Sequence, residues 1–193
     1  MPSSFAPGSE AIRTLALVRP PAAGKTTLCE ALLQACGGVG APGSVEKGTT
    51  VSDHDPLERR MQHSLNASLM HLTHGETRIH LVDTPGAPDF MGQSLPALEA
   101  VETAAVVINA TTGIEPMAVR MMDYAGRRKL DRLIIVNKID AGMDLAALLA
   151  QIQSAFGREC LPVNLTAARG SRVVDCFFKP TGESDISLVG GVR

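Results

Sequence analysis

Aromatic side chains are scarce in this sequence. Its 193 residues include no Trp, one Tyr and five Phe. Proteins that hold single-stranded nucleic acid stack the bases on aromatic side chains, and this composition offers little for such a surface. The net charge of −2 also gives no basic excess that would draw the whole protein onto nucleic acid or an anionic membrane. We therefore expect no direct, sequence-specific binding of nucleic acid.

Long apolar runs and paired cysteines are missing as well. No stretch reaches the roughly 18 apolar residues of a membrane-spanning helix, and the N-terminus lacks the basic and apolar regions of a secretion signal. The four cysteines form no C-x-x-C pair and have no histidine at zinc-finger spacing. The sequence therefore predicts a cytoplasmic protein with reduced, mostly buried thiols and no membrane partner.

Short apolar runs alternate with segments in which apolar residues recur every three or four positions. This alternation predicts an α/β fold with a mostly parallel sheet and helices on both faces. We expect strands at 14–18, 68–74, 77–82, 104–110 and 132–137. We expect helices at 25–36, 93–100, 116–129 and 144–156. Gly75 separates the second and third strands, which predicts an antiparallel edge hairpin.

Two stretches depart from this alternation. Residues 37–48 hold five glycines and one proline and lead into a polar segment, so this long loop is either functional or disordered. Beyond Phe156, two further strands are expected at 160–165 and 172–178, with a turn at 168–171.

A phosphate-binding loop is predicted between the first strand and the first helix. Gly24-Lys25-Thr26 matches the end of the P-loop pattern G-x-x-x-x-G-K-[ST], but Arg19 stands at the place of the first glycine. Lys25 is expected to neutralise the β- and γ-phosphates, and the Thr26 hydroxyl to ligate magnesium. Phosphate oxygens are expected to bind main-chain N–H groups of Ala23, Gly24, Lys25, Thr26 and Thr27. The alternative is an ordinary helix start that Thr26 or a neighbour caps.

A second motif, Asp83-Thr84-Pro85-Gly86, follows the third predicted strand. A carboxylate at this place in a P-loop fold holds magnesium, usually through water, so Asp83 is a candidate metal ligand. Gly86 is expected to offer its N–H to the γ-phosphate, because glycine lets the main chain approach closely. Taken alone, the same four residues are also an ordinary turn sequence.

The third motif, Asn137-Lys138-Ile139-Asp140, ends a buried strand and has the pattern N-K-x-D. The Asp140 carboxylate can accept hydrogen bonds from N1 and N2 of guanine, a pair of donors that adenine lacks. Lys138 is expected to lie along the base, and Asn137 to tie this loop to the phosphate loop. The alternative is a charged loop with a helix cap at Asp140 or Asp144. Three motifs in this order, each at a strand end, favour a guanine-nucleotide site over that alternative.

Together these residues resemble the G domain of translational GTPases, a P-loop NTPase fold, and above all elongation factor G and its divergent paralogues. The resemblance covers about 14–178. It is carried by the segments 23–28, 48–53, 64–68, 83–90 and 137–140.

The resemblance implies a site and a division of the chain. It makes Thr49 to Leu65 switch I, with Ser64 as a magnesium ligand, and Asp83 to Phe90 switch II. It implies GTP or GDP with Mg²⁺ as cofactors, the ribosome as a partner, and Lys25 and Gly86 as catalytic groups. It divides the chain into a flexible N-terminus (1–13), a GTP-binding domain (14–158), and the start of an insert or a truncated tail (159–193).

One departure from the family concerns catalysis. The histidine that positions the attacking water in the family is replaced by Ala87. Losing such a group costs roughly 10²-fold or more in rate, so hydrolysis of GTP is expected to be slow. The alternatives are a nucleotide-binding scaffold that does not hydrolyse GTP, and an ATP-dependent kinase, against which the N-K-x-D motif argues.

Two other features are candidate sites. His71 and His74 lie close in sequence, but three positions along a strand place them on opposite faces, which argues against a metal site. The basic run Arg127-Arg128-Lys129 could contact RNA, although a solvated helix end explains it better.

Overall fold

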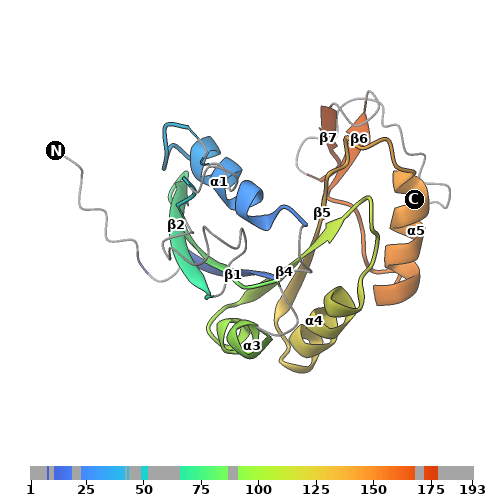
Figure 1. Cartoon of the computed structure of the whole chain (residues 1–193), viewed down its shortest axis with the longest axis horizontal. Coiled ribbons are helices and arrows are strands. Elements are labelled where there is room, and N and C mark those ends of the chain that lie inside the picture. Colours follow the sequence, from blue (N-terminus) through green and yellow to red (C-terminus); the bar gives the residue numbers. More distant parts are fainter. Residues whose placement is uncertain are drawn as a thin grey trace.

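The computed structural model describes residues 8, 11–18, 23–41, 43, 49–51, 66–86, 91–167 and 172–177. Within these residues the chain forms one five-stranded sheet, a two-stranded sheet and four helices (Figure 1).

The five-stranded sheet has the order β2-β3-β1-β4-β5. Its strands are β1 (Ile12–Val18), β2 (Ser68–His74), β3 (Thr77–Asp83), β4 (Thr103–Asn109) and β5 (Asp131–Asn137). Pairing is parallel except between β2 and β3, which form the predicted antiparallel edge hairpin around Gly75. The predicted mixed sheet is confirmed, and its strand ends differ from the expected ones by two residues or fewer.

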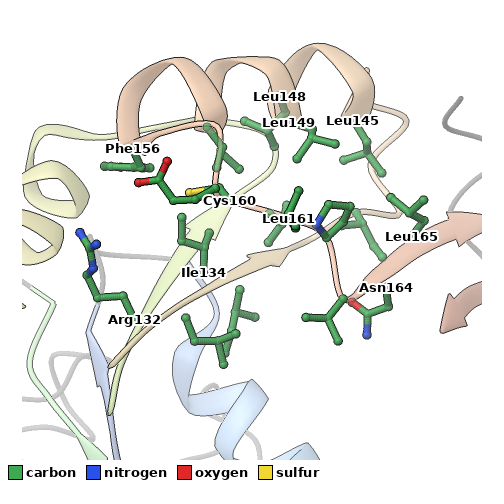
Figure 2. A pocket seen from close by; sticks show the side chains of 18 of the residues that line it. Arg132, Ile134, Leu145, Leu148, Leu149, Phe156, Cys160, Leu161, Asn164 and Leu165 are labelled. Atoms are coloured by element: carbon green, nitrogen blue, oxygen red, sulfur yellow. The ribbon is translucent and has the colours of Figure 1, made fainter. Parts of the chain in front are cut away.

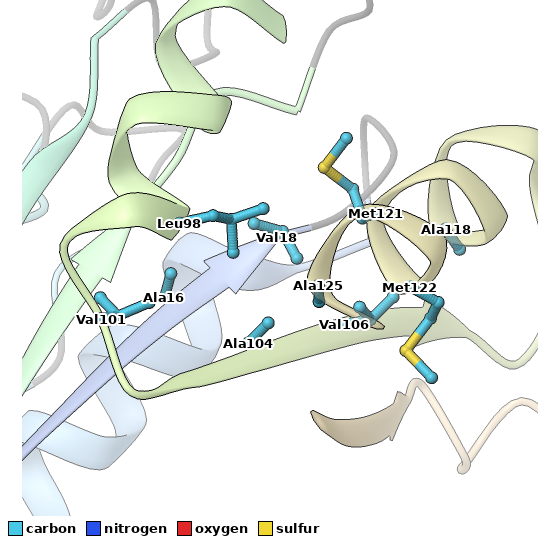
Figure 3. Close-up of a cluster of buried hydrophobic side chains, with 10 residues drawn as sticks. All are labelled: Ala16, Val18, Leu98, Val101, Ala104, Val106, Ala118, Met121, Met122 and Ala125. Carbon is cyan, nitrogen blue, oxygen red and sulfur yellow. The ribbon is translucent and has the colours of Figure 1, made fainter. Parts of the chain in front are cut away.

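Helices cover both faces of this sheet. They are α1 (Lys25–Ala35), α3 (Met91–Glu99), α4 (Pro116–Arg127) and α5 (Leu145–Phe156). Side chains alternate between the two faces of a strand. In β1, Leu17 therefore packs against α1 on one face, whereas Ala16 and Val18 pack against α3 and α4 on the other (Figure 3). Strand β4 lies inside the sheet, between β1 and β5, and faces both layers, which explains its uninterrupted apolar run from Ala104 to Ile108.

The second sheet corrects two predicted strands. It pairs β6 (Asn164–Ala167) with β7 (Arg172–Asp175), whereas strands were expected at 160–165 and 172–178. Cys160 lies in a turn, where its N–H donates to Gly157 O at 3.2 Å, and Pro162 has no N–H to donate to a ladder. These two features delay the first strand to Asn164. The second strand ends early, because the Phe177 N–H donates to the Asp175 side chain at 2.8 Å.

The structure also bears on the predictions for the cysteines, the histidines, the basic run and a membrane span. All four cysteines are free thiols, but Cys29 is the only one that is buried. His71 lies beside His80 of the neighbouring strand, with ring centroids 6.4 Å apart. Arg128 of the basic run forms an ion pair with Glu99. No helix among the described residues is long and apolar enough to span a membrane.

Two helices end in the same left-handed motif with different residues. After α1, Gly37 has φ 73° and donates to Gln34 O, while Gly38 donates to Leu33 O. After α4, Lys129 has φ 57° and donates to Gly126 O, while Leu130 donates to Ala125 O. This pair of bonds is the Schellman motif, whose left-handed position favours glycine.

We predict that Lys129→Gly stabilises the protein. A left-handed conformation costs an L-residue roughly 1–2 kcal/mol, and the greater freedom of glycine in the unfolded chain offsets part of that gain. The free energy of unfolding in urea is expected to rise by about 0.5–1 kcal/mol. Lys129→Ala is the control, since it removes the charge and keeps the β-carbon. An equal gain in both variants would assign the effect to charge and contradict the prediction.

Candidate functional site

The predicted motifs converge at one edge of the sheet. Parallel strands β1, β3 and β5 end at the same edge, and the segments 83–86 and 137–140 and the start of α1 follow these ends. Next to β1 the chain order reverses, because β3 lies on one side of it and β4 on the other. Such a switch point is where open α/β sheets bind ligands.

The phosphate loop ends at a helix start that glycine caps. Gly24 is the N-cap residue of α1, with φ 80° and ψ 26°, and it carries no side chain that could cap the helix. The first helical hydrogen bond runs from the Leu28 N–H to Gly24 O at 3.0 Å. The N–H groups that precede Leu28 therefore lie ahead of the helical ladder, where an anion can bind them. The alternative named Thr26 or a neighbour as the cap of an ordinary helix start. The cap is the neighbour Gly24, without a side-chain hydrogen bond.

Asn137 joins the two loops that would hold the ends of a nucleotide. Its Nδ2 donates to Ala23 O at 2.9 Å and reaches Gly24 O at 3.5 Å, across 114 and 113 positions of sequence. A β-carbon on Gly24 would lie 2.6 Å from the same Nδ2. Glycine is therefore required at position 24 both for its φ and for this close approach.

The predicted base-recognition loop, 137–140, continues the contact. Lys138 adopts φ 59°, a strained conformation for a residue with a side chain, of the kind found at functional sites. Its Cε lies 3.8 Å from the position that a β-carbon of Gly24 would take, so the stem of Lys138 runs beside the phosphate loop. Asp140 is exposed in the loop that follows, where its carboxylate is accessible to a ligand.

The candidate metal ligands are oxygen atoms in a sheltered position. Asp83 is 1% exposed and Thr26 is 7% exposed. Asp83 ends β3 in register with Leu17, at the strand end that leads to the phosphate loop. Thr84 secures this junction, since its hydroxyl donates to Leu17 O at 2.9 Å. Carboxylate and hydroxyl oxygens are hard donors of the kind that Mg²⁺ binds, and the two residues therefore fit the ion.

Several predicted site residues have a different status. Thr27 is exposed on α1, and Gly86 is buried at the end of the second motif. Arg19, Ser64, Ala87 and the side chain of Lys25 lie outside the described residues, as does most of the predicted switch I.

Sequence reasoning missed two polar residues that support the site. The Ser94 hydroxyl donates to Pro85 O at 3.1 Å and so ties α3 to the Asp83–Gly86 turn. Glu30 is a carboxylate that is 1% exposed on α1. Its signal was present in the sequence, because it shares the buried stripe of Thr26 and Leu33 at helical spacing.

A separate hollow lies between β5, α5 and the segment 159–165 (Figure 2). Its volume is about 800 Å³, and side chains such as Ile134, Leu148 and Leu161 make most of its wall aliphatic. No predicted nucleotide-binding residue lines it. Burial raises the pKa of the Cys160 thiol at its edge, with Glu159 adding to the shift and Arg132 opposing it. An aliphatic wall and a protonated thiol do not suit a polyphosphate.

Comparison with known proteins points to one group. A family model described as the elongation factor Tu GTP binding domain matches residues 10–183. An elongation factor G-like protein of Mycobacterium tuberculosis is 36% identical over 170 residues, which are 88% of this chain and 24% of that protein. Peptide chain release factor 3 of Symbiobacterium thermophilum is 31% identical over 180 residues, 90% of this chain and 34% of the relative.

The structural comparison agrees. A crystal structure from Thermus thermophilus matches with a TM-score of 0.81 and 36% identity, over 86% of this chain and 25% of that one. The chain thus spans 24% to 34% of the length of these relatives. The predicted P-loop fold, a mostly parallel sheet with helices on both faces and an edge hairpin, is confirmed.

Proposed function

Because the chain belongs to the elongation factor Tu GTP-binding domain family, we propose that it binds GTP and GDP with magnesium as part of an elongation factor G-like translation factor. The contact between Asn137 and the phosphate loop, 2.9 Å from Nδ2 to Ala23 O, carries this proposal. It sets the predicted guanine-binding loop beside the predicted phosphate-binding loop, the arrangement that one nucleotide needs.

The roles proposed for the nucleotide-binding residues follow their chemistry. Main-chain N–H groups from Ala23 to Thr27 and the Lys25 ammonium bind the phosphates, and the helix dipole adds to this attraction. Asp140 accepts from the guanine edge, while Asn137 and Lys138 hold the loop against Gly24. Backbone strain at Lys138 fits this role, because the strained conformation places Lys138 between the proposed base-binding Asp140 and the phosphate loop.

Thr26, Ser64 and Asp83 are the proposed magnesium ligands. When bound, the ion neutralises charge on the phosphates of the nucleotide. Thr26 and Asp83 are buried at the edge of the sheet where the phosphates would lie. Ser64 is proposed from the family resemblance alone.

We propose that hydrolysis of GTP is slow. Gly86 offers its N–H to the γ-phosphate, and Lys25 neutralises charge that develops during transfer. Ala87 has no group that can orient water, so the positioning part of catalysis is absent at that residue. The same substitution favours a second candidate function, a nucleotide-binding module that does not hydrolyse GTP.

The remaining proposals concern the setting of the domain. The GTP-binding domain is proposed to span 14–158, and 159–193 to begin an insert or tail, because β6 and β7 form a sheet of their own. The ribosome is the proposed partner and the cytoplasm the proposed location, in line with the translation factors that the chain resembles.

Two measurements test the proposed function. Calorimetric titration with GDP and Mg²⁺ should show one site, and a Lys25→Ala variant should show no binding under the same conditions. Absence of binding to the parent protein would refute the proposal.

Single-turnover hydrolysis of GTP, with and without ribosomes, then separates the two candidate functions, the slow GTPase and the non-hydrolysing module. A rate equal to that of buffer in both cases would replace the slow GTPase by the non-hydrolysing module.

A further inference from the structure

Glu30 is a buried charge that the proposed nucleotide site does not use. It lies in the middle of α1 with 1% of its surface exposed, among apolar neighbours such as Cys29 and Leu33. A carboxylate is costly to bury unless strong hydrogen bonds replace its water. The hydrogen-bond partners of the Glu30 carboxylate therefore indicate its role.

Both carboxylate oxygens of Glu30 bind main-chain N–H groups from the long loop after α1. Oε2 accepts from the Gly43 N–H at 2.7 Å, and Oε1 accepts from the Val51 N–H at 2.6 Å. Charge-assisted bonds of this length are the strong class of protein hydrogen bonds. One side chain thus fixes two points of the loop that lie eight positions apart in sequence.

The two points also pack against each other. A β-carbon on Gly43 would lie 2.6 Å from Thr50 Cα, so the two passes of the main chain are in direct contact. Thr50 is only 5% exposed. Glu30 therefore links α1 to two passes of the main chain, at Gly43 and at 49–51, that are in contact with each other.

The anchor is close to the proposed metal ligand. Glu30 follows Thr26 by four positions on one helix, so the two side chains lie one above the other on the same face. Both are buried, at 1% and 7% exposure. Val51, which Glu30 holds, is the last described residue before the segment that leads to Ser64.

We propose that Glu30 is a positioning residue that fixes residues 49–51, the first residues of the proposed switch I, one helical turn from Thr26. The inference rests on the proposed function, in which Ser64, within the predicted switch I, is a ligand of the magnesium ion that accompanies the nucleotide. GDP would contact the phosphate loop and the 137–140 loop, whereas GTP would also draw on switch I through its γ-phosphate. Losing the hydrogen bond between Val51 and Glu30 therefore weakens the binding of GTP and leaves the binding of GDP nearly unchanged.

The test uses Glu30→Gln in the full chain. In a glutamine side chain an NH₂ group, which cannot accept, replaces one of the two oxygens, so the N–H of Gly43 or of Val51 loses its partner. We expect the affinity for a non-hydrolysable GTP analogue to fall about 10-fold, while the affinity for GDP changes by less than about 2-fold. Hydrogen exchange at the Gly43 and Val51 amides in the nucleotide-free protein should accelerate by about 10-fold at one or both positions.

A matched control is Glu102→Gln. Glu102 also accepts from a main-chain N–H, that of Thr14 at 3.2 Å, but it lies at the opposite edge of the sheet from the site. This variant should leave the ratio of the two affinities unchanged. If the parent protein binds both nucleotides, either of two results would overturn the inference and leave the proposed function standing. One is an unchanged ratio of the two affinities in Glu30→Gln, and the other is unchanged hydrogen exchange at both amides. A parent protein that binds neither nucleotide would refute the proposed function and with it the inference.

Discussion

Asp140→Asn is expected to move the base preference of the protein from guanine to xanthine. The carboxylate of Asp140 can accept from both N1–H and N2–H of guanine, and charge-assisted bonds contribute roughly 1.5–3 kcal/mol each. An asparagine accepts one of these bonds and places its own NH₂ against the amino group at N2. Losing about 3 kcal/mol lowers the affinity for GDP by roughly 10²-fold. Xanthine carries a carbonyl oxygen at that position, to which the NH₂ can donate.

Competition of GDP, XDP and ADP for a fluorescent nucleotide measures this change. The control is Asp144→Asn, four positions along the chain. Asp144 caps α5, accepting from the Ala147 N–H at 3.0 Å, and asparagine serves equally well as a helix cap. The control should keep the parent's preference for GDP. If Asp140→Asn also prefers GDP over XDP as strongly as the parent does, Asp140 does not read the base.

Gly24→Ala is expected to disrupt both the fold around the phosphate loop and the binding of nucleotide. At φ 80° a β-carbon is strained, and it would lie 2.6 Å from Asn137 Nδ2. The strain and the displaced Asn137 bond together cost roughly 2–3 kcal/mol of stability. Moving Asn137 also separates the two loops that one nucleotide must bridge, so the affinity for GDP is expected to fall by at least about 10²-fold.

Urea unfolding and calorimetric titration with GDP measure the two effects. Gly37→Ala is the matched control, because Gly37 has φ 73° at the other end of α1 and no atom within 4 Å of its added β-carbon. It should lose about 1 kcal/mol of stability from φ alone and bind GDP as the parent does. Equal losses of stability and affinity in the two variants would show that the contact with Asn137 has no role of its own.

Local patterns predicted the framework of the site well. The apolar runs of β1, β3 and β5 predicted parallel strands, and each candidate motif begins where its strand ends. The prediction that the strand before Asn137 is buried was wrong, because β5 lies at the edge of the sheet and its residues are all exposed or half-buried. The predicted strand at 160–165 begins too early. This stretch is apolar, but Pro162 and the turn at Cys160 prevent pairing before Asn164.

The amino-acid sequence by itself determined the kind of fold, the order of the motifs and the residue types of the proposed site, because hydrophobic period and turn chemistry are local properties. Only the tertiary structure decided that Asn137 donates to the phosphate loop and that Glu30 holds Gly43 and Val51. These bonds join residues that lie 13 to 114 positions apart. Which polar groups meet over such separations depends on how the helices pack on the sheet, and no local pattern of residues encodes that packing.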